Sequence, residues 1–248
     1  MPEMILVFVM GLIIGSFLNV VCWRLPEGRS IVRPGSSCPQ CGQRLRVPDL
    51  VPVVSFLAYR GHCRYCGDKI SLQYPLVELI TGILLMVLYW QYGPAMEFFL
   101  YGLLTCLLIV CSVIDLKEMI IPNKITYPGI ISGLFLTMIT GHLSWLQALL
   151  GVLIPGGMLL LIALVYKEGL GLGDVKLIAM IGAFTGWHYA LPGLFLGALV
   201  GSLLGLGFIL VGKMDRKTRI PFGPLISLGA VLMMIFGEGW LEFYLGLF

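Results

Sequence analysis

The sequence is poor in charge, because Asp, Glu, Lys and Arg together make up only 12% of its 248 residues. A soluble globular domain carries about twice that share, so an ordinary soluble fold is excluded. Histidine is scarce as well, with three residues, and none of them pairs in an obvious way with a serine or a cysteine. The second shortage argues against a serine or cysteine hydrolase, in which a histidine activates the nucleophile.

Apolar residues make up 58% of the chain and fall into runs separated by short polar joints. A helix needs roughly 20 mostly apolar residues to cross the hydrocarbon core of a membrane. We therefore expect an all-α polytopic membrane protein with about eight transmembrane helices. The first run lacks the basic region and the cleavage site of a signal peptide, so we expect it to be retained. The expected spans are residues 4–22, 76–92, 97–114, 125–141, 145–166, 177–189, 190–212 and 222–242, of which the sixth is short and rich in glycine.

The Lys and Arg residues predict the orientation of these spans. Eight of them lie between Arg24 and Lys69, in one hydrophilic insert, and the other eight lie in three further joints on the same side. Because cytoplasmic loops carry the excess of Lys and Arg, we expect the insert in the cytoplasm and both termini outside. The net charge of +3 then suits anionic lipid headgroups, and no feature predicts a nucleic-acid partner. The eight joint residues are Lys117, Lys124, Lys167, Lys176, Lys213, Arg216, Lys217 and Arg219.

Three domains are predicted: a first transmembrane helix over 1–22, a cytoplasmic domain over 23–75 and a transmembrane domain over 76–248. The cytoplasmic domain contains two C-x2-C pairs separated by 21 residues, formed by Cys38, Cys41, Cys63 and Cys66. Such pairs suit a tetrahedral zinc ion, and a closed four-thiolate site has a structural role. Thiols remain reduced in the cytoplasm, which disfavours disulfides.

Two alternatives to the four-thiolate zinc site stay open at this stage. In one, His62 replaces one of the sulfur ligands, and in the other the four cysteines bind nothing. The three remaining cysteines lie in or beside apolar spans and are expected to be packing residues. They are Cys22, Cys106 and Cys111.

Two acidic residues adjoin apolar runs directly, whereas most of the others lie in polar segments. Asp115 ends the third apolar run, and Asp174 precedes the sixth in a glycine-rich stretch. Glu78 shares the same membrane boundary but lacks glycine neighbours, so we rank it third. Two adjacent carboxyl groups share a proton, so that one acts as a base toward water and the other as an acid. The glycines beside Asp174 would let an extended peptide approach closely.

These two aspartates also allow other interpretations. They are expected at helix ends in any case, where Lys117 and Lys176 would neutralise them. Paired intramembrane acids also occur in proton-coupled or ion-coupled transporters. A third alternative is a non-catalytic zinc-ribbon adaptor, in which neither carboxyl group takes part in a reaction.

Several motifs in order along the chain resemble the prepilin peptidase family, also called type IV leader peptidases. One is the G-x-G-D sequence at 171–174, and another is the segment Asp115-Leu-Lys-Glu-Met-Ile-Ile-Pro-Asn123. The four-cysteine insert is similar to the cytoplasmic domain of that family. The resemblance extends to residues 15–26, 52–63, 74–78 and 220–224, and so covers most of the chain.

This resemblance implies an intramembrane aspartyl peptidase in the bacterial cytoplasmic (inner) membrane. Family members cleave the basic leader from precursors of pilins and pseudopilins, and serve type IV pili or type II secretion. Asp115 and Asp174 match the catalytic aspartates. Most bacterial members also methylate the new N-terminal amine with S-adenosylmethionine, an activity associated with the insert, where Gly61 is the candidate cofactor contact. The chain departs from the family pattern at Asp49, where asparagine is frequent, and at Asn123, where aspartate is frequent.

Overall fold

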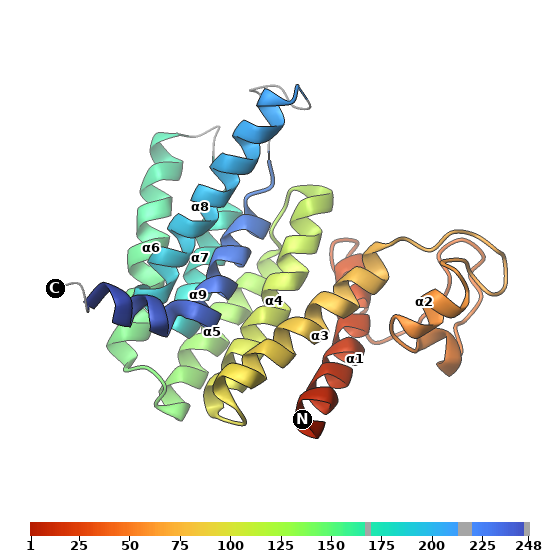
Figure 1. Cartoon of the computed structure of the whole chain (residues 1–248). Helices are drawn as coiled ribbons and strands as arrows, with labels where there is room; N and C mark the ends of the chain where they lie inside the picture. Colours follow the sequence, from red (N-terminus) through yellow and green to blue (C-terminus); the bar gives the residue numbers. More distant parts are fainter. Residues whose placement is uncertain (167–169, 213–219, 246–248) are drawn as a thin grey trace. The chain divides into compact units, whose positions relative to one another are not determined.

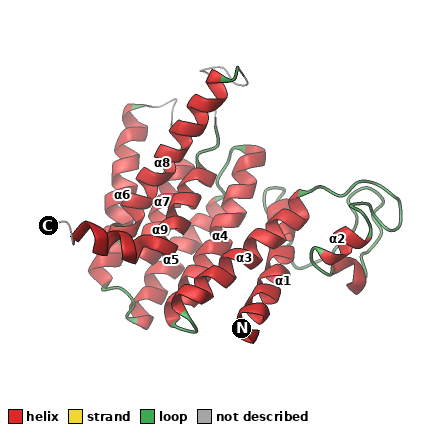
Figure 2. Cartoon of the chain, viewed as in Figure 1, coloured by secondary structure: helices red, strands yellow, loops and turns green. Residues whose placement is uncertain are grey.

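The computed structural model describes residues 1–166, 170–212 and 220–245, which are built from helices and loops (Figures 1 and 2). Within these residues the only β-type pairings are two isolated bridges, Ser37 with Arg44 and His62 with Lys69. The all-α prediction is therefore confirmed. The chain divides into two compact units, Met1–Gly93 and Pro94–Phe248. The predicted domain boundaries at 22 and 75 stay a prediction.

The first unit contains two long helices, α1 (Pro2–Arg24) and α3 (Gln73–Tyr92), with the insert between them. The insert holds the short helices η1 (Val47–Leu50) and α2 (Val54–Ala58). Small residues let α1 and α3 approach closely, because a Cβ added to Gly11 would lie 2.7 Å from the Cα of Gly82. Such small-residue contacts are typical of helix pairs in membranes, where no hydrophobic effect drives the helices together.

Buried polar side chains join α1 to the rest of this unit. Asn19 donates a hydrogen bond of 3.0 Å to the carbonyl of Tyr74, at the start of α3. Arg24, at the end of α1, is buried and donates to the carbonyls of Ser30, Pro34 and Gly35. A buried guanidinium must be satisfied in this way, so Arg24 fixes the first loop of the insert.

The described residues of the second unit form six helices: α4 (Met96–Glu118), α5 (Asn123–Thr140), α6 (Trp145–Val165), α7 (Leu172–Thr185), α8 (Trp187–Leu210) and α9 (Gly223–Leu245). α7 is the core of this unit, since it contacts all five of the other helices and every residue from Leu177 to Thr185 is buried. Gly151 of α6 and Gly182 of α7 lie against each other, so that the two backbones are in contact.

The eight long helices correspond one for one to the eight predicted apolar runs. Five of them, α1, α3, α4, α6 and α8, are long and apolar enough to cross a membrane, counted over the described residues. The prediction for α7 was inaccurate, because this helix covers 172–185 rather than 177–189. Its 14 residues extend about 21 Å, less than the roughly 30 Å of a hydrocarbon core.

Part of the predicted charge pattern cannot be placed on this fold. The basic residues that lie outside the described residues are Lys167, Lys213, Arg216, Lys217 and Arg219.

Candidate active site

Asp115 lies near the C-terminal end of α4 and is 5% exposed. Its Oδ2 accepts a hydrogen bond of 2.9 Å from the backbone N–H of Gly223, the first residue of α9. The carboxyl group is thereby oriented by a residue 108 positions away in the sequence. Sequence reasoning identified Asp115 and missed Gly223, although the Pro-Phe-Gly-Pro stretch at 221–224 was among the motifs of the resemblance.

Asp174 lies in the first turn of α7, 9% exposed, and not ahead of the helix as predicted. Its Oδ2 accepts the backbone N–H of Gly171 at 3.3 Å. The first turn of a helix presents unpaired N–H groups and a positive partial charge, which stabilise an acidic side chain there. The helix therefore begins early enough to hold Asp174 by its own N-terminus.

The structure brings Asp115 and Asp174 together. α4, which carries Asp115, contacts α7, which carries Asp174. Ile121, in the loop after α4, lies between the backbones that hold them: a Cβ on Gly173 would be 3.0 Å from Ile121 Cβ, and one on Gly223 would be 3.2 Å from Ile121 Cδ1. Ile121 is a second residue that sequence reasoning missed, because its role depends on this three-way contact.

The lysines near the two aspartates do not neutralise them. Lys176 Nζ donates to Asn123 Oδ1 at 2.6 Å and lies 5.4 Å from the centre of the Tyr127 ring. Among the described residues, neither Asp115 nor Asp174 takes part in an ion pair within 4.0 Å. Two neighbouring buried acids without a paired cation are suited to sharing one proton, which is the arrangement an acid and base pair needs.

Glu78, the third candidate, has a local partner in the first unit. It is 7% exposed, and its Oε2 accepts a hydrogen bond of 2.7 Å from the N–H of Val53, whose φ is 60°. A left-handed valine is costly, so the surrounding contacts must hold it in place. Glu78 has a clear structural task here: it fixes the turn that begins α2.

The four predicted cysteines come together in the insert. The sulfur atoms of Cys38, Cys41, Cys63 and Cys66 all lie within 4.8 Å of one another, and those of Cys38 and Cys66 are 3.9 Å apart. Tetrahedral zinc with Zn–S bonds of about 2.3 Å requires sulfur atoms about 3.8 Å apart, so the donor set fits zinc in type, number and spacing.

The two C-x2-C turns have the same backbone geometry. The N–H of Cys38 donates to the carbonyl of Gln43 at 3.0 Å, and the N–H of Gly42 donates back to the carbonyl of Cys38 at 2.9 Å. Cys63 repeats this pattern with Asp68 and Gly67, at 2.7 and 2.9 Å. Each turn therefore directs two thiols to one side, as the spacing predicted.

The pKa values of two of these thiols also favour the binding of a cation between the four sulfur atoms. The pKa of Cys63 falls to about 7, because the backbone N–H groups of Cys66 and Tyr65 point at its sulfur. Cys66 receives the N–H of Asp68, but burial and the side chains of Asp68, Cys63 and Cys41 outweigh it and raise its pKa to about 12. Cys63 therefore forms a thiolate readily, whereas Cys66 would need the charge of a bound metal ion to do so.

A polar cluster that the sequence did not predict links η1 to the second cysteine turn. Asp49 Oδ2 accepts the N–H of Arg46 at 2.9 Å and the hydroxyl of Tyr65 at 2.8 Å, and Arg64 Nη1 lies 3.8 Å from Oδ1. The N–H of Arg46 is the main cause that holds the pKa of Asp49 below its usual value. Asp49 therefore ties the two halves of the insert together.

Gly61 and His62, the other two insert residues singled out, have local roles. Gly61 has φ +72°, donates its N–H to the carbonyl of Phe56 at 2.8 Å and accepts the N–H of Ile70 at 2.8 Å. Its N–H is thus already used within the insert, and a cofactor contact at Gly61 stays a prediction. His62 Nδ1 lies 2.8 Å from the carbonyl oxygen of Arg60, and the described four-sulfur cluster does not include it.

Comparison with known proteins covers both units. Residues 9–92 match the model of the bacterial peptidase A24 N-terminal domain, and residues 102–206 match that of the type IV leader peptidase family. The chain is 35% identical over 240 residues to the prepilin leader peptidase/N-methyltransferase of Bacillus subtilis (strain 168), covering 97% of each chain. The protein of the same name from Aeromonas hydrophila is 35% identical over 272 residues, covering 97% of this chain and 93% of its own. No solved structure matches the chain.

Proposed function

Because this chain belongs to the type IV leader peptidase family, we propose that it removes the leader from type IV prepilins or pseudopilins and then N-methylates the new N-terminal residue. It is an enzyme of the membrane, a peptidase with a second, methyl-transferring activity. The observation that carries the peptidase assignment is the pair Asp115 and Asp174, buried on two helices that contact each other, with no ion pair to either carboxyl group among the described residues.

In the proposed cleavage step the ionised carboxylate of the pair takes a proton from a water molecule, whose oxygen attacks the scissile carbonyl carbon. The protonated carboxyl group hydrogen-bonds the carbonyl oxygen as negative charge develops there. The C–N bond then breaks, and a carboxyl proton passes to the leaving amine. The N–H groups of Gly223 and Gly171 would keep each carboxyl group aimed during this exchange.

The proposed topology has eight spans, with the insert in the cytoplasm and both termini outside, in the bacterial inner membrane. α7 is too short to cross a bilayer alone, but its side chains are surrounded by five other helices. A helix enclosed by protein does not have to match the lipid thickness. A precursor with a basic leader keeps that leader in the cytoplasm by the positive-inside rule, which would present its cleavage point at the same boundary.

We propose that zinc bound by Cys38, Cys41, Cys63 and Cys66 folds the insert and takes no part in hydrolysis. A four-thiolate site is closed and leaves no open position for water or substrate. For methylation, S-adenosylmethionine supplies an electrophilic methyl group when bound. The amine that receives it is the one that the cleavage step releases.

The test is an assay of the purified protein in detergent with a synthetic precursor and S-adenosylmethionine, read by mass spectrometry. The proposal predicts loss of the leader followed by gain of one methyl group. An intact precursor, together with substrate flux in sealed vesicles, would instead support a transporter.

A further inference from the structure

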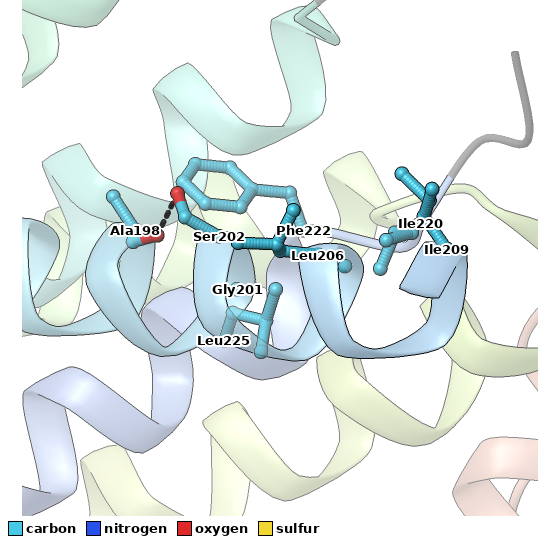
Figure 3. Close-up of a pocket in the computed structure, with 9 residues that line it drawn as sticks. Ala198, Gly201, Ser202, Leu206, Ile209, Ile220, Phe222 and Leu225 are labelled. Atoms are coloured by element: carbon cyan, nitrogen blue, oxygen red, sulfur yellow. Dashed lines mark hydrogen bonds between the residues drawn. The ribbon is translucent and has the colours of Figure 1, made fainter. Parts of the chain in front are cut away.

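Exposed apolar surface has a different meaning on the membrane helices and on the insert. On a helix that crosses a membrane it is expected, because lipid chains cover it. The groove of about 510 Å³ along α8 is of this kind (Figure 3): its lining is apolar apart from Ser202, whose hydroxyl already donates to the carbonyl of Ala198 at 2.8 Å. Exposed apolar side chains in the insert lie outside every predicted span and need a separate explanation.

Five such side chains lie within residues 47–57, which we call the apolar segment. It consists of η1, most of α2 and the turn between these two helices, which pack against each other. On α2, Val54 and Leu57 are 60% and 68% exposed and share one side of the helix. Phe56 instead points into the insert, where a Cβ on Gly61 would be 3.0 Å from its ring. The five exposed residues are Val47, Leu50, Val51, Val54 and Leu57.

Charge is arranged around the apolar segment and not on its surface. Its only charged residue is Asp49, whose side chain is 5% exposed and accepts the N–H of Arg46 and the hydroxyl of Tyr65. An exposed arginine lies beyond each end, Arg46 before the segment and Arg60 after it. Such a pattern is typical of a segment in a membrane interface, because guanidinium groups reach anionic headgroups while apolar side chains enter the acyl chains.

Glu78 sets the depth of the apolar segment. Its Oε2 accepts the N–H of Val53, the residue before α2, at 2.7 Å. Glu78 also packs on Gly15 of α1, where a Cβ would be 2.7 Å from the Cα of Glu78. Within the predicted spans 76–92 and 4–22, these two residues lie about 3 and 10 Å inside the membrane boundary. Figure 1 accordingly shows the insert folded back beside α1 and not continued beyond its end.

The backbone at the start of α2 suits this depth. The acyl region offers no water to unpaired N–H groups, so irregular backbone there needs partners within the protein. Glu78 provides one for Val53, and the N–H groups of Ser55 and Leu57 donate to the carbonyls of Val51 and Val53, both at 3.0 Å. The start of α2 can therefore lie among acyl chains without leaving these three donors unpaired.

We propose that residues 47–57 anchor the insert to the cytoplasmic leaflet of the bilayer, with Val54 and Leu57 among the acyl chains and Arg46 and Arg60 on anionic lipid headgroups. A soluble protein cannot reach side chains at this depth, and a substrate with a basic leader offers no anionic match for the arginines. The inference requires that α1 and α3 cross the membrane with the insert in the cytoplasm, as proposed above. It does not depend on the peptidase or methyl-transfer assignment.

Photo-cross-linking of the full-length protein in nanodiscs that contain phosphatidylglycerol tests the contact. Benzoylphenylalanine replaces Leu57 in one sample and Gln40, an exposed residue of the first cysteine turn, in another. The inference predicts lipid adducts from position 57 and none from position 40. Adducts from position 57 with an added precursor, with a second copy of the enzyme or with another part of the same chain would overturn it. Equal lipid yields from the two positions would also overturn it.

Hydrogen exchange measures the strength of the anchor. Leu57→Asp places a charge among the acyl chains, and Val32→Asp makes the same change at an exposed apolar residue of the insert outside the segment. We expect amides 51–58 to exchange about tenfold faster or more in Leu57→Asp, the scale of one apolar side chain withdrawn from lipid, and at the wild-type rate in Val32→Asp. Exchange at the wild-type rate in Leu57→Asp, or equally fast exchange in both variants, would contradict the anchor. The cross-linking result does not depend on the folding of either variant.

The arginines are tested by the lipid composition. Exchange of amides 51–58 in the wild type should be slower with phosphatidylglycerol than with phosphatidylcholine alone, by about fivefold for each arginine. The double variant Arg46→Gln, Arg60→Gln keeps the backbone N–H that Asp49 accepts and should lose this dependence. Equal wild-type rates in the two lipids would contradict the contact with anionic headgroups. Lipid adducts from a protein that cuts no precursor would support the anchor and overturn only the proposed function.

Discussion

Replacing Gly223 with alanine should slow peptide cleavage without unfolding the protein. The added Cβ would lie 2.8 Å from Asp115 Oδ2 and 3.2 Å from Ile121 Cδ1, whereas ordinary contact begins at 3.4 Å. The carboxylate oxygen must therefore move by about 0.6 Å or more, since Ile121 closes the other side. A misplacement of about 1 Å in an active site costs on the order of a hundredfold in rate. We expect kcat for cleavage to fall by roughly ten- to a hundredfold.

The assay compares Gly223→Ala with Gly157→Ala, a glycine of α6 at which a Cβ meets nothing within 4 Å. Alanine keeps the backbone N–H, so the substitution changes only the space around Asp115. Thermal unfolding in detergent should be similar for the two variants, and methylation of a pre-cut substrate should be unaffected in both. The reasoning is refuted if a folded Gly223→Ala enzyme cleaves within about twofold of the control, because 0.6 Å of displacement would then have no consequence.

Three further predictions concern the first unit. Cys63→Ser should abolish stoichiometric zinc by elemental analysis while Cys106→Ser retains it; equal zinc in both would rule out the four-thiolate site. Glu78→Ala removes the acceptor of a buried backbone N–H and should destabilise the fold by about 1–3 kcal/mol, seen as faster hydrogen exchange at the start of α2; unchanged exchange there would contradict the role given to Glu78. Asp49 has a pKa lowered chiefly by the N–H of Arg46, so its stabilisation is present above the unfolded value of about 3.9 and is lost as the pH falls below it. The stability of the insert should therefore depend less on pH in Asp49→Asn than in the wild type. Identical acid transitions in the two proteins would show that this carboxylate does not contribute to stability.

The helices were predictable wherever the signal was local. Seven of the eight apolar runs are long enough to specify a helix by themselves; the sixth, 177–189, is short, and its end lies beyond Gly186 in α8. The start of α7 was misjudged because Gly171 and Gly173 indicate a loop by intrinsic propensity. In the structure Gly171 is the residue before the helix and Gly173 lies inside it, because packing among five other helices outweighs the cost of one glycine.

The same limit applied to the candidate sites: residues marked by a local sequence pattern were predictable, and contacts that depend on tertiary packing were not. Paired cysteines at C-x2-C spacing form their own turns, so four residues near in sequence suffice to predict the cluster. Asp115 and Asp174 stand out because acids are rare beside apolar runs. The N–H of Gly223 and the side chain of Ile121 depend on how the start of α9 meets the end of α4. No local pattern encodes that contact, and the same holds for the bond between Asp49 and Tyr65.

The most direct test of the account is a comparison of the wild type with Asp115→Asn and Asp174→Asn in the cleavage of a synthetic precursor by purified protein. Mass spectrometry would follow leader loss, and methylation of a pre-cut substrate would be measured in the same samples. The account predicts that each single substitution abolishes cleavage while methylation persists. Cleavage that survives in either variant would contradict the aspartate-pair mechanism for that residue.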